Sequence, residues 1–343
     1  MGKTFKINNK NFKVEIKKNL LNFLSPTSPG TKYYDSPPER EVNKFEKGRI
    51  LLQVNQFLAL MSSVGAELKN KKLLDIGTGN GLVPRLILNF SKLSNCDGTD
   101  PFHDGEHTTS WQKHDRDKLF LDMKKYFIKN DFKLDIKKYS QNLKLEDFSL
   151  KPRKVNLAKN TKEKKMSFYS FGAEELGKLN KKYDILYCKA LEHISNLALI
   201  VKNFSLVSKK GSIVYLKHRS FFSYLGPHRY ASTGIPWGHV LMNNSEYKKY
   251  VSKFHKKRKK RMLDFYFSEL SYPRFTVNEI IEQFLKNKFQ LILKINENGR
   301  FNLEKSKKSK ILLTNWSIIK KNYPSLSLEE LMSGMYHLIF KKI

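Results

Sequence analysis

The glycine-rich segment from Asp75 to Gly81 constrains the fold of this 343-residue chain more than any other stretch. It follows an apolar run and holds three glycines at alternate positions, and apolar residues with helical spacing resume at Leu82. This pattern is typical of a buried strand, a tight turn and the first turn of a helix. Glycine has no Cβ, so the turn can adopt positive φ and bring a ligand close to the backbone. The segment therefore predicts an α/β fold whose helix N-terminus faces an anionic ligand group.

The spacing of the glycines distinguishes between the known motifs that bind nucleotide-like ligands. The dinucleotide fingerprint requires a glycine three positions after Gly79, where Leu82 stands, and no Gly-Lys-Ser/Thr follows to make a Walker motif. The run Asp75-x-Gly77-x-Gly79-x-Gly81 instead resembles motif I of the class I S-adenosylmethionine-dependent methyltransferases. The alternative is a turn with a purely structural role. The resemblance implies a Rossmann-like α/β fold, with a seven-stranded, mostly parallel sheet, an antiparallel last strand and helices on both faces.

The same resemblance implies S-adenosyl-L-methionine as cofactor and places its contacts at strand ends. In the family the turn faces the amino-acid end of the cofactor, and an acid after the second strand holds the ribose hydroxyls. Residues after the third strand contact the adenine ring, although Gly172 stands here where the usual acid falls. The expected cofactor-binding residues are Asp75, Gly77, Thr78, Gly79, Gly81, Asp100, Ala173, Glu174 and Cys188.

The remaining sequence supplies the strands and helices that such a fold needs. A helical pattern covers residues 41–61, and a small hairpin outside the core is expected within residues 5–17. Later strands are expected at 166–171, 182–188, 211–217, 289–295 and 335–341. We therefore divide the chain into an N-terminal hairpin and loop, residues 1–40, and a methyltransferase domain, residues 41–343, with insertions at about 101–165 and 218–275.

The candidate chemistry lies after the fifth strand, where three histidines stand among aromatic residues, Gly and Pro. We expect His228 or His239, or else His218, to act as a general base, because imidazole titrates near neutral pH. Each could equally be a packed or exposed loop residue. Arg219 and Arg229 could bind an anionic acceptor. The stretch resembles a histidine pattern of bacterial methyltransferases encoded near polysaccharide genes, which implies O-methylation of a small-molecule or saccharide-linked hydroxyl.

The charge of the chain keeps other functions open. The net charge is +33 and the pI is about 9.9, but Lys is spread over the whole chain, as a compositional bias would produce. Only residues 253–261, expected on a helix beginning near Ser245, concentrate charge enough to suggest a polyanion contact. The alternatives are thus an RNA methyltransferase and a non-catalytic, cofactor-binding interaction module. Nucleic acid is a possible partner that we do not favour, and the oligomeric state is left unassigned.

The location of the chain and its metal content are also expectations at this stage. Cys96 and Cys188 form no CxxC spacing and are expected to be buried thiols in a reducing compartment. The N-terminus lacks a signal-peptide pattern, and no apolar stretch has membrane-spanning length, so we expect a cytoplasmic protein. Potential ligands gather between His103 and His114, but such loops are usually only polar, and we expect no metal.

Overall fold

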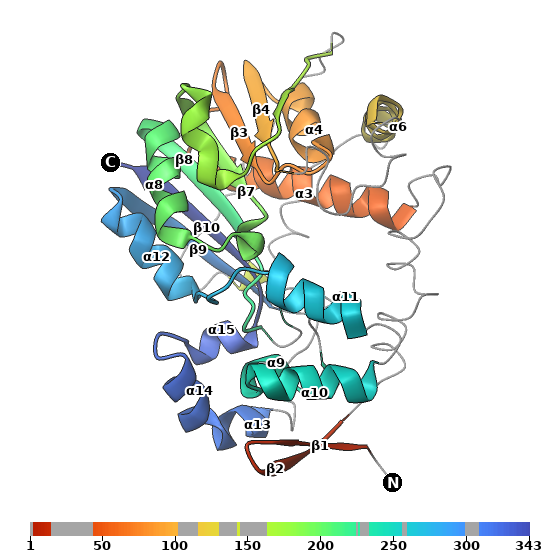
Figure 1. Cartoon of the computed structure of the whole chain (residues 1–343). Helices are drawn as coiled ribbons and strands as arrows, with labels where there is room; N and C mark the ends of the chain where they lie inside the picture. The colour runs from red at the N-terminus through yellow and green to blue at the C-terminus, as the bar shows by residue number, and fades with distance from the viewer. Residues whose placement is uncertain are drawn as a thin grey trace.

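The computed structural model of the chain describes residues 3–14, 44–101, 116–129, 143–144, 163–223, 226, 233–255, 259–298 and 309–343. These residues build a mixed α/β structure around one large sheet, with a second group of helices beside it (Figure 1).

The sheet contains the seven expected strands and one more, in the order β5-β9-β10-β8-β7-β3-β4-β6. Strands β8, β7, β3, β4 and β6 are parallel, and β10 runs antiparallel to both β8 and β9. The fold prediction, including the reversed last strand, is therefore confirmed. The unexpected β5 is only two residues long and pairs antiparallel with the edge strand β9. The bounds are β3 (Lys72–Ile76), β4 (Asn95–Thr99), β5 (Leu143–Lys144), β6 (Ser167–Tyr169), β7 (Tyr183–Cys188), β8 (Ser208–His218), β9 (Phe289–Asn298) and β10 (Ser333–Lys342).

Helices cover both faces of the sheet, as expected. One face packs against α3 (Lys44–Ser63), α4 (Leu82–Phe90) and α6 (Arg116–Lys129), and the other against the 3₁₀-helix η1 (Ala173–Leu179), α8 (Leu197–Val207) and α12 (Val277–Lys286). Successive strand residues belong to opposite clusters: Leu73 and Tyr215 face the first set of helices, and Leu74 and Leu216 face the second. Because both faces are covered, central strands contain apolar runs, such as Leu73-Leu74 in β3 and residues 213–216 in β8.

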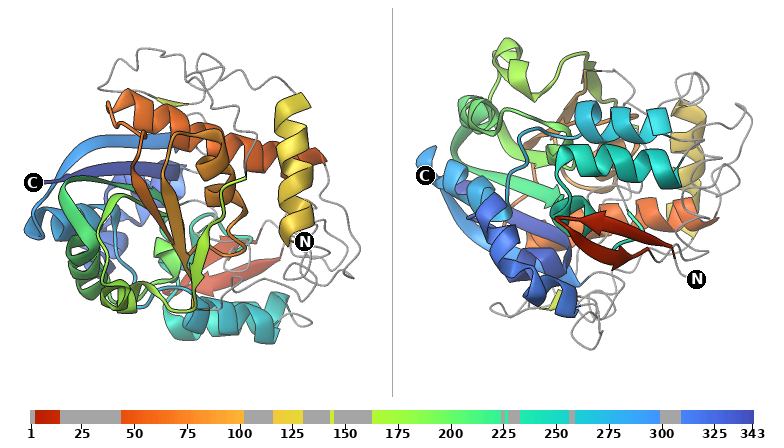
Figure 2. Two further views of the ribbon diagram at one scale, coloured as in Figure 1. Left: turned by 90° about the horizontal axis from the view of Figure 1, so that it is seen from above. Right: turned by 60° about the horizontal axis from the view of Figure 1, so that its bottom comes forward.

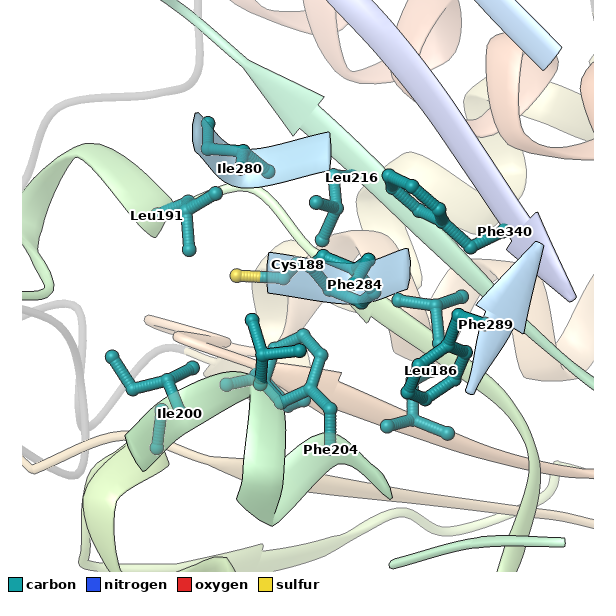
Figure 3. Close-up of a cluster of buried hydrophobic side chains, with 14 of the residues drawn as sticks. Leu186, Cys188, Leu191, Ile200, Phe204, Leu216, Ile280, Phe284, Phe289 and Phe340 are labelled. Atoms are coloured by element: carbon teal, nitrogen blue, oxygen red, sulfur yellow. The ribbon is translucent and has the colours of Figure 1, made fainter. Parts of the chain in front are cut away.

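Figure 3 shows the cluster on the second face. The side chain of Cys188 lies in it with Leu216 of β8 and Phe284 of α12. Cys96 is buried in the cluster on the first face. Both cysteines are therefore free, buried thiols, in agreement with the sequence-based expectation.

A second group of elements lies below the sheet in Figure 1 and encloses a hydrophobic cluster of its own; we call this group the lobe. It consists of the hairpin β1 (Thr4–Ile7) and β2 (Lys10–Lys13) together with α9 (Gly238–Leu241), α10 (Asn244–Phe254), α11 (Lys259–Asp264), the π-helix η5 (Phe265–Glu269), α13 (Ser309–Thr314), α14 (Trp316–Asn322) and α15 (Leu328–Met332). Its elements α9, α10, α11 and η5 lie within residues 218–275, where an insertion is expected, and the others lie outside that range. The division after residue 40 stays a prediction, because residues 15–43 are outside the described residues.

The hairpin has a larger role than expected. We expected it outside the core, but Phe5, Ile7 and Val14 are buried in the cluster of the lobe. The ring of Phe5 meets Tyr250 of α10 edge-on, with 5.3 Å between the centroids, and Figure 2 shows the hairpin next to that helix. The alternation of β1 thus buries one face of a strand that would be marginal alone.

The basic run at 253–261 does not lie on one helix, which corrects the sequence-based expectation. A capping box formed by Asn243 and Glu246 starts α10, close to the expected position, but the helix ends at Phe254. His255 has non-helical dihedral angles, and α11 begins only at Lys259. In the described part of the run, Lys253 is therefore on α10, and Lys259, Lys260 and Arg261 are on α11. None of the helices in the described part of the chain is both long and apolar enough to cross a membrane.

Candidate functional site

The glycine turn follows β3 directly and is fastened to the end of β4. The backbone N–H groups of Gly77 and Thr78 both donate to the carbonyl oxygen of Thr99, at 2.9 and 3.0 Å. The φ angles of Gly77, Gly79 and Gly81 are 71°, 58° and 69°, in the left-handed region that side chains with a Cβ rarely adopt. The turn is thus a fixed piece of backbone at the carboxyl edge of the parallel strands.

The three glycines of the turn differ in their surroundings. A Cβ on Gly77 would lie 2.4 Å from the Cβ of Ala190, and one on Gly81 would lie 2.4 Å from the ring of Phe168. A Cβ on Gly79 would have nothing within 4 Å. The outer glycines therefore permit close packing within the protein, whereas Gly79 borders open space where a ligand can approach the backbone.

Asp100, the acid expected to hold the ribose, lies at this open position. Its Oδ2 accepts a hydrogen bond from the N–H of Gly79 at 2.9 Å, and Asp100 as a whole is only 7% exposed. Its own N–H donates to the carbonyl oxygen of Tyr169, which ties the end of β4 to β6. The carboxylate and the glycine turn thus form one unit.

Two polar atoms beside the turn are buried without a hydrogen-bond partner among the described residues: Oδ1 of Asp75 and Oγ1 of Thr99. The other carboxylate oxygen of Asp75 accepts a hydrogen bond from Oγ1 of Thr78 at 2.8 Å. Burial raises the pKa of Asp75 to about 6, an effect that nearby Lys189 partly offsets. Unpartnered buried atoms are uncommon in folded proteins, and both of these atoms belong to residues that are fully buried beside the turn.

The residues expected near the adenine ring lie at the start of η1. The side-chain amide of Asn203 donates to the carbonyl oxygens of Ala173 and Glu174, at 3.0 and 2.7 Å. This fixes the start of η1 against α8, leaving Glu174 exposed and Ala173 buried. Their contact with a cofactor stays a prediction.

Cys188 ends β7, beside β3, so its backbone lies near the turn. Its side chain points into the hydrophobic cluster, where burial raises the pKa of the thiol to about 12. The thiol therefore stays protonated at neutral pH, and Cys188 can serve a ligand only through its backbone.

The structure describes two of the three candidate histidines, and His228 is outside the described residues. His218, at the end of β8, is buried, stacks on Phe275 and has no hydrogen-bond partner on either ring nitrogen within the described structure. His239 is buried in α9, where the backbone of Phe221 and Ser223 hydrogen-bonds to its ring. Burial lowers the pKa of His218 to about 3 and that of His239 to about 4. Both are neutral at pH 7, and their roles as bases stay predictions.

The parallel strands bring several of these residues to one edge of the sheet. Strands β8, β7, β3 and β4 are consecutive neighbours and point the same way. Their carboxyl ends place His218, Cys188, the glycine turn and Asp100 along one line, where ligands of open α/β sheets bind. His239 belongs instead to the lobe, and the ring of Phe221 lies 5.2 Å from its ring.

Glu330, which the sequence analysis did not identify, is a buried carboxylate near the end of β8. Its Oε1 accepts a hydrogen bond from Oγ of Ser220 at 2.5 Å, and its two oxygens lie 3.1 and 3.0 Å from the backbone nitrogen of Val277. Burial raises its pKa to about 7. No motif surrounds Glu330 in the sequence, so no local signal could have marked it.

Other expected residues fall outside this description. The potential metal ligands at 103–115 and Arg229 lie outside the described residues, and Arg219 is exposed. Within the described ranges, no group of three or more His, Cys, Asp or Glu side chains could hold a metal ion.

Comparisons with known proteins add weak similarities. No family model and no curated protein matches the chain. Among solved structures, magnesium protoporphyrin IX methyltransferase from Synechocystis PCC 6803 with bound SAH matches with a TM-score of 0.43 at 10% identity, covering 95% of this chain and 97% of that chain. The cyclopropane synthase MmaA2 from Mycobacterium tuberculosis matches with a TM-score of 0.42 at 13% identity, covering 96% and 95%. Because these TM-scores are below 0.5, we base the function on the chain's own strand order and glycine turn.

Proposed function

We propose that this chain is an S-adenosyl-L-methionine-dependent methyltransferase. The observation that carries the proposal is the open position at Gly79, whose N–H donates to the carboxylate of Asp100 at the carboxyl edge of β3 and β4. The motif resemblance implies that the turn with Gly79 faces the amino-acid end of the cofactor and that Asp100 holds its ribose hydroxyls. The expected seven strands, with the last reversed, support the same reading.

The residues present fit such a cofactor. Gly79 leaves room for its approach, and Asp100 offers a carboxylate for ribose hydroxyls. When bound, S-adenosyl-L-methionine supplies an activated methyl group. The protein then has to align the acceptor, exclude water and, for a hydroxyl acceptor, remove a proton.

For the acceptor we propose a small-molecule or saccharide-linked hydroxyl, with a histidine as general base. His239 is the described candidate that fits best, because its backbone contacts orient the ring and leave Nε2 without a partner among the described residues. Its lowered pKa keeps the imidazole neutral at pH 7, which is the form that accepts a proton. The low pKa also makes it a weak base, so positioning rather than basicity would have to supply most of the rate.

The test is transfer of label from methyl-labelled cofactor to nucleotide sugars, glycans and RNA. We expect the wild type to label a hydroxyl of a small molecule or saccharide, and Asp100→Ala to lower the transfer at least about tenfold. Asp117→Ala is the matched control, because Asp117 is an exposed aspartate of α6 that pairs with Arg85, whereas Asp100 accepts a hydrogen bond from Gly79. Label appearing only in RNA would favour the RNA methyltransferase. Cofactor binding with no transfer to any acceptor would contradict catalysis and favour a binding module.

A further inference from the structure

Arg274 is a half-buried arginine in the segment that joins η5 to α12. Its Nη1 donates to the carbonyl oxygen of Ser271 and its Nη2 to that of Tyr266. These contacts hold the guanidinium in one orientation. A guanidinium has five N–H donors, so hydrogen bonds to two backbone carbonyls use only part of its donor capacity.

Aromatic rings surround this guanidinium. Its central carbon lies 4.5 Å from the ring centroid of Phe221, 4.8 Å from that of Tyr266 and 5.6 Å from that of Tyr272. These distances allow cation–π attraction, which partly replaces lost hydration. Tyr272 is 55% exposed, so one ring of this set faces solvent and can receive a ligand.

Arg274 has no carboxylate partner within the part of the chain that the structure describes. The ionisable groups that act on its charge are the tyrosines Tyr266, Tyr323 and Tyr247. Partly buried charges in proteins are usually paired, because rings and carbonyl dipoles leave the net charge uncompensated. Arg261, in the same lobe, shows the ordinary arrangement, since both of its terminal nitrogens bond to the carboxylate of Glu269.

The segment that carries Arg274 is attached to the loop after β7, next to the glycine turn. The N–H of Ser271 donates to the carbonyl oxygen of Glu192 at 2.8 Å, and Nδ1 of His193 lies 2.8 Å from the carbonyl oxygen of Glu269. Ala190, in the same loop, is the residue that packs against Gly77. On its other side, Arg274 shares the ring of Phe221 with His239. Arg274 thus shares a ring with the candidate base, and its segment is hydrogen-bonded to the loop that packs against the proposed cofactor turn.

We propose that Arg274, with the rings of Phe221, Tyr266 and Tyr272, binds the anionic group of the methyl acceptor. The group is a carboxylate or phosphate attached to a ring that stacks on the exposed Tyr272. An Arg fork matches the paired oxygens of either anion, and aromatic side chains accept a flat ring or the apolar face of a sugar. This inference rests on the proposed methyltransferase function and narrows its acceptor to acids.

The test compares acids with neutral molecules that contain the same ring. Glucuronate and glucuronamide, salicylate and salicylamide, and phenyl phosphate and phenol are titrated by calorimetry in about 0.15 M salt, which screens non-specific attraction to a basic protein. We expect at least one acid to bind the wild type at least about ten times more tightly than its neutral partner. The pair that responds distinguishes saccharide acids, aromatic acids and phosphates. Absence of a preference for the acid in every pair would overturn the proposal.

Two variants assign the preference to Arg274. Arg274→Gln should reduce the ratio of the two affinities to within about twofold, and Arg261→Gln, which removes the same charge nearby, should keep it. The ratio is taken within one variant, so partial unfolding lowers both affinities and leaves it unchanged. A preference that survives in Arg274→Gln would contradict the proposal.

A third variant keeps the proposal testable if Arg274→Gln fails to fold. Tyr272→Leu changes an exposed residue, so it should fold and should weaken both members of the responding pair several-fold while keeping their ratio. Unchanged affinities would contradict the stacking role. Titration with S-adenosyl-L-methionine separates the two proposals: cofactor binding without acid preference removes only this inference, and acid preference without cofactor binding removes the proposed function.

Discussion

The glycine turn and the wall around Arg274 are two parts of one proposed site, but they are built in different ways. The turn is a short run of consecutive residues whose backbone is hydrogen-bonded to the end of β4, and it depends on side chains being absent. The wall consists of Tyr266, Tyr272 and Arg274, from one stretch of nine residues, and of Phe221 from the segment after β8, and it depends on side chains filling space. Adding a side-chain atom should therefore destabilise the turn, whereas removing side-chain atoms should destabilise a region formed by packed side chains.

The largest expected effect follows from removing atoms in the lobe. Trp237 is fully buried, and its Nε1 donates to the carbonyl oxygen of Leu331 in α15 at 2.8 Å. Trp237→Ala should lower the free energy of unfolding by about 3–5 kcal/mol, because it leaves a cavity and an unpaired carbonyl. Denaturant unfolding measures the loss. Leu313→Ala, at an exposed position of the same lobe, should change stability by less than about 0.5 kcal/mol. A loss below about 1 kcal/mol in Trp237→Ala would show that the lobe does not depend on this packing.

Adding an atom to the turn should have the next largest effect. Gly77→Ala meets both a positive φ and a Cβ only 2.4 Å away, so we expect a loss of roughly 2–4 kcal/mol in unfolding free energy. Gly79→Ala has a similar φ but open space, so its loss should be only about 1–2 kcal/mol. Parallel urea titrations would measure both. Equal losses would mean that the contact with Ala190 does not matter.

The smallest effect concerns Glu330 of α15, which accepts hydrogen bonds from Ser220, the residue before Phe221 of the wall, and from the first residue of α12. Its folded-state pKa of about 7 lies above the ordinary value of 4.5, so the folded state binds the proton more tightly. This contribution to stability is fully present below about pH 4.5 and is lost as the pH rises through about 7. Relative to Glu330→Gln, the wild type should therefore lose about 1 kcal/mol per pH unit in this window. Parallel stability curves for the two proteins would contradict the raised pKa.

The difference between turn and wall also explains what the sequence could predict. Central strands contain apolar runs because both faces of the sheet are covered, and the turn needs glycines at fixed positions, so both can be recognised locally. The distance of Asp100 from the turn follows from the resemblance. The fold and the proximity of Asp100 to the glycine turn were therefore predictable, and their contact with a cofactor stays a prediction.

The acceptor side could not be predicted, because no motif marks its residues. Tyr266, Tyr272 and Arg274 lie within nine residues of one another, but Phe221 meets Arg274 only after folding. Glu330 lies in a Leu-Glu-Glu-Leu segment that suggests an exposed helix face, yet it is buried. The end of α10 at Phe254 has no Gly or Pro to mark it, so the basic run was assigned to one helix.

The most direct test of the cofactor proposal is calorimetric titration with S-adenosyl-L-methionine of the wild type, Gly79→Ala and Gly65→Ala. Gly65 and Gly79 both have positive φ, 70° and 58°, and neither has an atom within 4 Å of an added Cβ, so the two substitutions strain the backbone alike. Only Gly79 lies at the proposed site. We expect saturable binding to the wild type and Gly65→Ala, and binding at least about tenfold weaker, a difference of about 1.4 kcal/mol, to Gly79→Ala. No saturable binding to the wild type, or equal weakening by both substitutions, would contradict the proposal.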